Sequence, residues 1–354
     1  MSVLLRVIRR PQSLGDLSIG EWNRLLAEIR PLRLGGRLSW IIEDQGLVDA
    51  CPAPAWEELR AQRYFAQATQ ARVRLELRSL RKALAEVQAP VILLKGAAYM
   101  QSGLRLARGR DFADLDILLR RDELEAVETA LAAGGWVSET HDRYDQRYYR
   151  RWMHELPPLR HRQRSLEVDL HHDVLPLTSR LRPDVALLWA ASQPLALHPF
   201  RVLCPEDMLL HSATHLFQDG EISGDLGGLL DLHQLLLEFA DLEGFWQRLP
   251  NRAERLQLGR PLYYALLFCA SLLQTPIPKD TLETVRRFAP GRLNGRLMEW
   301  LVPRVLEPRY PTRRPAHIAI WLLYLRSHWL RMPPVLLTLH LLRKLGRHMG
   351  KQLA

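Results

Sequence analysis

The sequence predicts an α+β fold in which a small mixed sheet, flanked by helices, lies between an N-terminal and a C-terminal helical region. Helical periodicity fills the first and last thirds of the chain, and short apolar runs of strand length occur only in the middle third. The length of 354 residues suits two or three packed units. We therefore expect helices in 1–88, the sheet in 89–200, and helices in 201–354 that close over a cleft.

The N-terminal region is expected to hold three or four helices between Ser18 and Gln88. Ser18 is of a residue type that caps helix N-termini, and the stretch from Cys51 to Pro54 interrupts the helical pattern. A long amphipathic stretch rich in alanine, arginine, leucine and glutamate follows this break.

Four segments of the middle third are predicted strands. The run 91–94 is apolar and begins with β-branched residues, and 115–119 is a second apolar run. Apolar and polar side chains alternate along residues 146–154 and 165–171. We therefore expect these segments to be antiparallel strands joined around 157–164.

Helices are predicted to connect and follow these strands. Gly96 lies at the turn into a short helix that begins at Ala97. Residues 122–133 are expected to form a helix that Asp122 caps and Gly134 ends. The last third returns to a helical pattern, with breaks at 220–228, 276–278 and 303–315.

The formal net charge of +10 and the pI near 9.9 favour phosphate-rich partners. Most of the excess is arginine scattered through predicted helices, which a solvated or salt-bridged surface also explains. A dedicated nucleic-acid surface is therefore not expected.

The cysteines and the chain ends favour a cytoplasmic location. The three cysteines lie far apart, are odd in number and lack CxxC spacing, which argues against both a disulfide framework and a zinc site. The N-terminus lacks the pattern of a secretory signal, and no apolar segment reaches about 18 residues. These cysteines are Cys51, Cys204 and Cys269.

Three aspartates are the strongest candidates for a functional site. Asp114 and Asp116 are separated by one residue at the start of a predicted strand, so both carboxylates project from one face. Asp169 occurs in a second segment of alternating apolar and polar residues. If this segment is a strand next to the first one, Asp169 lies beside Asp114 and Asp116. Converging carboxylates repel each other unless cations neutralise them, and Mg²⁺ or Mn²⁺ is the natural partner for oxygen ligands. A solvated strand face remains the alternative for Asp114 and Asp116 alone.

A candidate phosphate cradle precedes these aspartates. Lys95 and Gly96 follow a predicted buried strand and open a helix, where backbone N–H groups can receive a phosphate. Arg105, Arg108 and Arg110 lie between this turn and the aspartates and also suit phosphate oxygens. The combination predicts phosphoryl or nucleotidyl transfer by two-metal chemistry.

Several histidines are secondary candidates. His171 shares the strand face of Asp169, so it either orients the carboxylate, meets a phosphate, or only ends the strand. His211 and His215 share a helix face without the glutamate of HExxH, so metal binding is not expected. A contact from His215 to substrate or nucleotide is favoured instead.

Asp231, the glycines of 220–228 and the C-terminal helices each have a structural explanation. Asp231 is interpreted as a structural hydrogen-bonding residue of a helix, and the glycines of 220–228 as an interhelical loop without a phosphate-loop pattern. The basic, tryptophan-containing helices predicted after 317 either pack on the core or lie on an anionic membrane surface. Peripheral membrane contact and dimerisation through these helices both stay open.

The motifs resemble those of the uncharacterised nucleotidyltransferase family of the DNA polymerase β superfamily. The likeness covers most of the chain. It rests on LLKGAA at 93–98, Arg110, DLDILL at 114–119, DLH at 169–171, CPEDMLLH at 204–211 and LLDL at 229–232.

The resemblance implies roles for the acidic residues: Asp114 and Asp116 would bridge two metals, and Asp169 would hold the metal that activates an acceptor hydroxyl. Lys95 and Gly96 occupy the place of the Gly-Ser triphosphate turn of better-known superfamily members. The eighteen positions from Gly96 to Asp114 exceed the superfamily norm, so the nucleotide pocket is expected to be shaped differently.

The sequence thus predicts transfer of a nucleoside monophosphate from a nucleoside triphosphate to a hydroxyl-bearing acceptor, with release of pyrophosphate. The acceptor, whether a sugar, glycan, protein or small molecule, and the base preference are not determined by these residues. The alternative is a non-catalytic nucleotide-binding or scaffold protein, peripheral to a membrane through its C-terminal helices.

Overall fold

The computed structural model describes residues 2–87, 89–138, 140, 142–197, 199–218, 222, 226–308 and 316–331. Within this part of the chain, seven strands form one mixed sheet, and helices make up most of the remainder. The predicted α+β class is therefore confirmed. The division of the chain at 88 and 200 stays a prediction.

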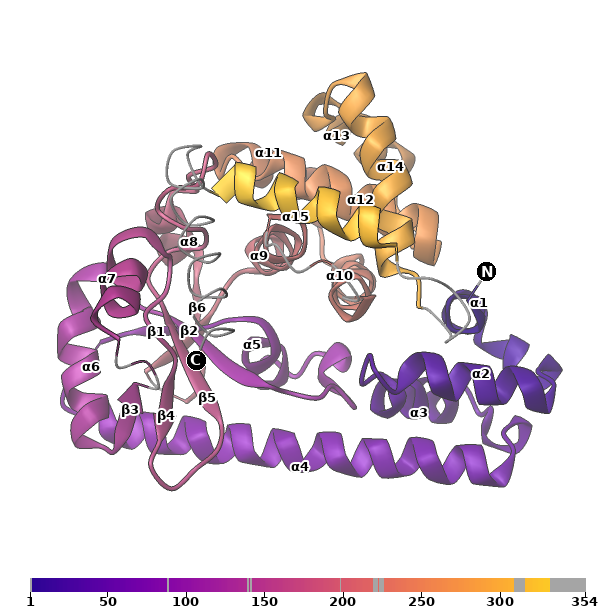
Figure 1. Ribbon diagram of the computed structural model, residues 1–354, viewed down its shortest axis with the longest axis horizontal. Coiled ribbons are helices and arrows are strands. Elements are labelled where there is room, and N and C mark those ends of the chain that lie inside the picture. Colours follow the sequence, from indigo (N-terminus) through magenta and orange to yellow (C-terminus); the bar gives the residue numbers. More distant parts are fainter. Residues whose placement is uncertain are drawn as a thin grey trace, which may run out of the picture.

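The N-terminal helices are α1 (Val3–Arg9), α2 (Ile19–Ile29), α3 (Gly35–Asp44) and α4 (Ala53–Ala83), with 3-10 turns η1 (Pro11–Asp16) and η2 (Val48–Ala50). Ser18 caps α2 as expected, because its hydroxyl accepts from the Glu21 backbone N–H while the Glu21 carboxylate accepts from the Ser18 N–H. Helix α4, 31 residues long, runs along one long side of the molecule under both the sheet and the other N-terminal helices (Figure 1).

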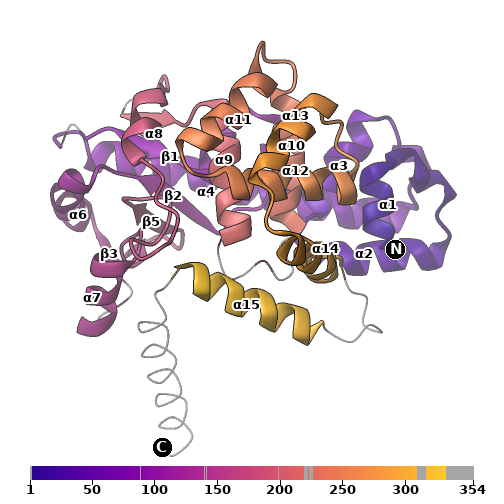
Figure 2. The same ribbon diagram turned by 90° about the horizontal axis from the view of Figure 1, so that it is seen from above.

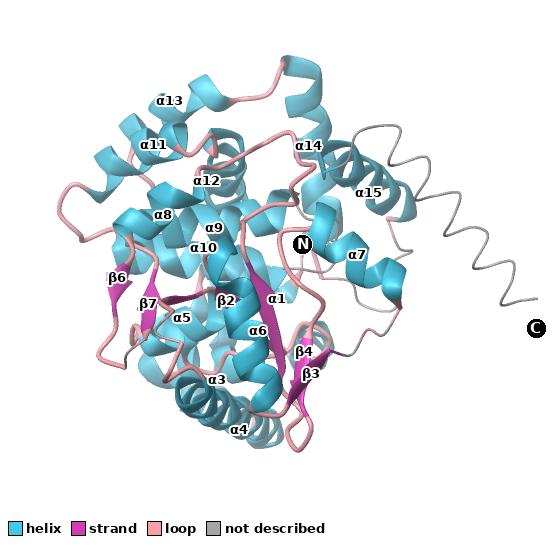
Figure 3. Ribbon diagram, turned by 90° about the vertical axis from the view of Figure 1, so that its left-hand side faces the viewer, coloured by secondary structure: helices cyan, strands magenta, loops and turns pink. Residues whose placement is uncertain are grey.

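The sheet has the strand order β3-β4-β5-β2-β1-β7-β6. β2 pairs with β5 in parallel, while β1 pairs antiparallel with β2 and parallel with β7. Figure 3 shows β3 and β4 toward one edge and β6 and β7 at the other. The strands are β1 (Val91–Leu93), β2 (Asp114–Leu118), β3 (Trp136–Ser138), β4 (Leu159–His161), β5 (Glu167–His171), β6 (Gln193–Pro194) and β7 (Phe200–Val202).

The predicted strand at 146–154 is wrong, because most of it lies in helix α7 (Arg143–Trp152). Its aromatic residues follow helical spacing, and the rings of Tyr148 and Trp152 meet one turn apart with centroids separated by 5.6 Å. The antiparallel neighbour of β5 is β4, which the sequence analysis placed in the connecting segment. Only the short stretch around Glu155 is extended, and Glu155 forms an isolated antiparallel bridge with His171.

Two helix starts also differ from expectation. Helix α5 (Lys95–Gln101) begins at Lys95 rather than at Ala97. A 3-10 turn, η4 (Arg121–Glu123), precedes α6 (Leu124–Ala133), so Asp122 does not cap that helix. The predicted end of α6 at Gly134 is confirmed.

Eight described helices and the turn η5 follow β5 along the chain, and a further turn, η3 (Arg105–Ala107), precedes β2. The predicted break at 276–278 separates α12 from α13, but Gly227 and Gly228 lie in α10, and α14 continues through Pro303. Gly220 and Gly224 lie outside the described residues. The elements are α8 (Val185–Ala191), α9 (Pro205–Gln218), α10 (Leu226–Phe239), α11 (Phe245–Arg255), α12 (Gly259–Leu273), α13 (Lys279–Val285), η5 (Arg286–Phe288), α14 (Arg292–Leu306) and α15 (His317–Arg331).

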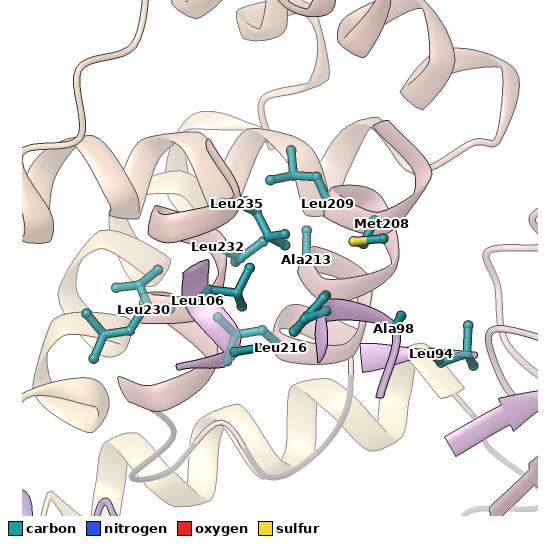
Figure 4. Close-up of a cluster of buried hydrophobic side chains, with 14 of the residues drawn as sticks. Leu94, Ala98, Leu106, Met208, Leu209, Ala213, Leu216, Leu230, Leu232 and Leu235 are labelled. Atoms are coloured by element: carbon teal, nitrogen blue, oxygen red, sulfur yellow. The ribbon is translucent and has the colours of Figure 1, made fainter. Parts of the chain in front are cut away.

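One continuous hydrophobic core joins the sheet to the C-terminal helices. Buried leucines and alanines of α5 and η3 pack against buried residues of α9 and α10, as the cluster in Figure 4 shows. In Figure 2 these helices lie side by side over the middle of the molecule, between the sheet and the N-terminal helices. This core fixes α9 and α10 across from β2. The labelled residues are Leu94, Ala98, Leu106, Met208, Leu209, Ala213, Leu216, Leu230, Leu232 and Leu235.

Two glycines let the N-terminal helices approach the segment that leads into β2. Gly109 has a φ of +66°, and a Cβ added there would overlap the carbonyl oxygen of Gly36 at the start of α3. A Cβ on Gly36 would in turn lie 2.5 Å from the carbonyl oxygen of Gly109. Because both partners are backbone atoms, neither can move without shifting α3 or the segment that carries Arg110.

We expect Gly109→Ala to lower the free energy of unfolding by about 2–5 kcal/mol, from positive-φ strain together with the backbone overlap. Gly103→Ala is the matched control, because Gly103 has a φ of +71° but open space around an added Cβ. The control should lose only about 1–2 kcal/mol. Urea denaturation of both variants measures the difference, and equal losses would show that the contact between Gly36 and Gly109 imposes no constraint.

Candidate functional site

Pairing of β2 with β5 brings the three candidate aspartates together. Asp116 lies directly opposite Asp169 in the parallel register, and Asp114 lies on the same face two residues earlier. One carboxylate oxygen from each of the three lies within 4.8 Å of the others. The convergence expected from the sequence is therefore present.

The pKa values of the three carboxylates are shifted in different directions. Burial, and then the negative charge of Asp116, raises the pKa of Asp114 and raises the pKa of Asp169 to about 8. Burial would also raise the pKa of Asp116, but Lys95 and His171 outweigh it and hold that pKa well below its ordinary value. The Oδ1 atom of Asp169 is buried without a hydrogen-bond partner. An oxygen left unpaired among like charges is suited to bind a cation.

Lys95 and His171 both bind Asp116. The Lys95 ammonium and the His171 Nε2 each donate to Asp116 Oδ1 at 2.9 Å. Lys95 adopts a φ of +44°, which is uncommon outside glycine, at the first residue of α5. Burial would lower the pKa of His171, but its hydrogen bond to Asp116 raises it overall. In this structure, Lys95 thus neutralises a carboxylate at the site.

Gly96 allows close packing of Arg110. A Cβ at Gly96 would lie 2.5 Å from both the Arg110 Nη1 and the Phe112 ring. Arg110 Nη2 pairs with Asp231 Oδ2 at 3.2 Å, and its guanidinium lies 5.3 Å from the centroid of the Phe112 ring. A side chain at position 96 would therefore overlap Arg110, which lies in the segment that leads into β2.

Arg37 on α3 completes the cationic side of the site, where Asp231 on α10 holds it, and no local sequence pattern pointed to Arg37. The Asp231 carboxylate contacts both Arg37 and Arg110. Burial would raise the pKa of Asp231, but the two arginines lower it overall. The Arg37 Nη1 is buried without a hydrogen-bond partner. Asp231 was interpreted as structural from the sequence, and it holds two arginines at the site.

A pocket of about 310 Å³ lies over these groups. Residues from α3, α5, the segment before β2, α9 and α10 line it, so all three sequence regions contribute. The side chains that matter most are those of Arg37, Lys95, Arg110, Asp114, His215 and Asp231.

His215 faces this pocket, and burial, followed by the charge of Lys95, lowers its pKa to about 3. It is therefore a neutral imidazole at physiological pH. Neither His211 nor His215 belongs to the two groups in the described chain whose atoms converge closely enough for one metal ion. Arg110 lines this pocket, whereas Arg105 and Arg108 line a neighbouring pocket that shares Leu34 and Arg37 with it.

Residues 19–274 match the model of a family described as uncharacterised nucleotidyltransferases. The chain belongs to this nucleotidyltransferase family. The match covers α2 to α12 and includes every candidate residue of the site. No match was found among curated proteins.

A solved structure is similar to this chain at low identity. The crystal structure of JHP933 from Helicobacter pylori is 15% identical, and the match covers 82% of this chain and 98% of that chain. Its TM-score is 0.32, which is too low to support a shared function or site.

The raised pKa of Asp169 predicts how stability depends on pH. An aspartate with an ordinary pKa of 3.8 that titrates at about 8 when folded binds more protons in the folded than in the unfolded state between these values. The free energy of unfolding contributed by Asp169 should therefore fall as pH rises from about 4 to about 8. Asp169→Asn should remove this loss, which amounts to at most about 6 kcal/mol.

Denaturation at pH 5 and pH 9, with EDTA present, measures this difference between wild type and Asp169→Asn. Asp122→Asn, at an exposed carboxylate after β2, is the control and should follow the wild-type curve. Parallel curves for all three proteins would contradict the raised pKa.

Proposed function

We propose that this protein transfers a nucleoside monophosphate from a nucleoside triphosphate to a hydroxyl-bearing acceptor and releases pyrophosphate. The observation that carries the proposal is the register that places Asp116 opposite Asp169, with Asp114 on the same face and a cationic pocket beside them. Membership of the nucleotidyltransferase family supports the same reaction class.

Asp114, Asp116 and Asp169 suit Mg²⁺ or Mn²⁺. Their oxygen donors match hard divalent cations, and the unpartnered Oδ1 of Asp169 offers a ligand atom that the protein itself does not satisfy. When bound, such ions would stabilise charge on the attacking and leaving oxygens. Lys95 and His171 hold Asp116 ionised, and therefore ready to bind a cation.

The cationic side chains would orient the triphosphate. Arg110 and Arg37 are fixed by Asp231 and face the pocket, and planar guanidinium groups suit bidentate contact with phosphate oxygens. The neutral imidazole of His215 would contact nucleotide or acceptor from α9. These residues would position the reacting groups, and positioning accounts for much of the rate gain in phosphoryl transfer.

The reaction forms one bond and breaks one bond. The acceptor oxygen loses its proton to solvent and bonds to the α-phosphorus. The bond from the α-phosphorus to the bridging oxygen then breaks, and pyrophosphate leaves with that electron pair. The acceptor class stays open among sugars, glycans, protein side chains and small molecules.

The test combines labelled nucleoside triphosphates, Mg²⁺ and host-cell extract with purified protein. We expect pyrophosphate release and a product whose mass exceeds the acceptor's by one nucleotide. Asp114→Asn and Asp169→Asn should each lower the rate by about 100-fold or more, because each removes a charged ligand of the reacting site. Asp122→Asn should retain the wild-type rate.

Two outcomes would contradict the proposal. Nucleotide binding without pyrophosphate release across a broad acceptor screen would favour a non-catalytic nucleotide-binding or scaffold protein. Absence of binding to any Mg²⁺–nucleotide, together with no effect of Asp114→Asn on binding or stability, would exclude a nucleotide function of the site.

We also propose that α14 and α15 contact an anionic membrane surface. Leu293, Leu297 and Trp300 recur at helical spacing on α14, and all three are exposed. The helix also exposes three arginines and one glutamate, so its charge complements anionic lipid. Helix α15, which packs on α14, exposes Ile318, Trp321 and Trp329. The charged residues are Arg292, Arg296, Arg304 and Glu299.

None of the described helices combines the length and apolar character needed to cross a bilayer.

Sedimentation with vesicles tests this contact. We expect binding to vesicles that contain phosphatidylglycerol and little binding to phosphatidylcholine alone, because the arginines require anionic lipid. The double variant Leu293→Ser, Leu297→Ser should weaken binding, whereas Ile19→Ser, at an exposed apolar residue of α2, should not. Equal weakening by Ile19→Ser, or no binding to either vesicle, would refute the contact.

A further inference from the structure

A second cluster of metal-binding side chains lies next to the aspartates. His154, Glu155 and His171 each offer one donor atom, and the three atoms lie within 4.8 Å of one another. Both histidines are buried and Glu155 is half-buried. No sequence pattern pointed to this cluster, and the strand predicted at 146–154, which ends at His154, is mostly helix α7.

The backbone holds the cluster in place. The segment that contains His154 and Glu155 runs antiparallel beside the end of β5, with Glu155 bridged to His171. The Leu156 N–H donates to the Leu170 carbonyl at 2.9 Å, and the His172 N–H donates to the His154 carbonyl at 2.8 Å. The three side chains are therefore fixed by main-chain hydrogen bonds on both sides of the cluster.

The spacing fits a four-coordinate metal ion. Glu155 Oε2 lies 3.5 Å from His171 Nδ1 and 3.8 Å from His154 Nε2. Ligands held about 2.0–2.2 Å from a tetrahedral zinc ion lie about 3.3–3.6 Å apart. Small side-chain movements therefore suffice to close the three donors around one ion.

The orientation of His171 also points to a metal. Its Nε2 donates to Asp116 Oδ1, which leaves Nδ1 as the nitrogen that faces Glu155. That Nδ1 is buried and has no hydrogen-bond partner. A histidine that gives its other N–H to a carboxylate is the usual arrangement for a metal ligand.

We infer that His154 Nε2, Glu155 Oε2 and His171 Nδ1 form a binding site for a zinc-type transition-metal ion. Two imidazole nitrogens and one carboxylate suit Zn²⁺ or Co²⁺, whereas the all-oxygen aspartate cluster suits Mg²⁺. The two sites are distinct in chemistry and are linked by the hydrogen bond from His171 to Asp116. This inference does not depend on the proposed nucleotidyl transfer.

Cobalt titration of the full-length, EDTA-treated protein tests the site, because four-coordinate Co²⁺ absorbs visible light and Zn²⁺ does not. We expect visible bands that saturate near one equivalent, persist in excess Mg²⁺, and are displaced by Zn²⁺. Glu155→Gln and His154→Asn should each weaken Co²⁺ binding by at least about 10-fold.

Two controls separate this site from other cation sites. Asp114→Asn removes a ligand of the aspartate cluster, and His317→Asn removes an exposed histidine of α15, so neither should change the cobalt spectrum. Circular dichroism establishes that each variant is folded. If Glu155→Gln and His154→Asn both unfold, the visible Co²⁺ bands of the wild-type protein, and whether they persist in excess Mg²⁺, decide whether the site binds a metal ion.

Either of two results would overturn the inference. Absence of Co²⁺ and Zn²⁺ binding would identify the cluster as an ion-paired network in which His171 bridges Asp116 and Glu155. Cobalt binding that Mg²⁺ or Asp114→Asn abolishes, but Glu155→Gln leaves intact, would place the ion at the aspartates.

Discussion

The site depends on the parallel pairing of β2 with β5. This register sets Asp116 opposite Asp169 and places Asp114 on the same face, so three carboxylates converge where little water can screen them. Such a cluster is stable only if positive groups face it. The approach of Lys95 and His171 to one Asp116 oxygen, and the backbone that places them there, follow from this constraint.

A second charged contact holds the three sequence regions around the pocket. Asp231 of α10 binds Arg37 of α3 and Arg110 of the segment before β2. The close approach of Gly36 to Gly109 brings α3 near enough for this contact. The cationic side of the pocket is thus assembled by residues separated by almost two hundred positions, and its geometry depends on packing of the helices against the sheet.

His171 connects the two clusters of metal-binding groups. One ring nitrogen donates to Asp116, and the other faces Glu155. A cation bound at either cluster would therefore change the charge that the other experiences, because imidazole transmits polarisation between its two nitrogens. The position of His171 at the end of β5, beside the strand residues that carry Asp169, makes this coupling short and direct.

The sequence by itself determined the α+β class, the shared strand face of Asp114 and Asp116, and the N-cap at Ser18, whereas the pairing of β2 with β5 brought Asp169 to them. These features follow from periodicity and local hydrogen bonding, which the order of residues encodes directly. Tertiary structure alone decided that Arg37 joins the site, that Arg105 and Arg108 face another pocket, and that α7 replaces a predicted strand. It also decided that His154 meets His171. Contacts of this kind join residues far apart in the chain, and they depend on how helices and strands pack rather than on any local pattern.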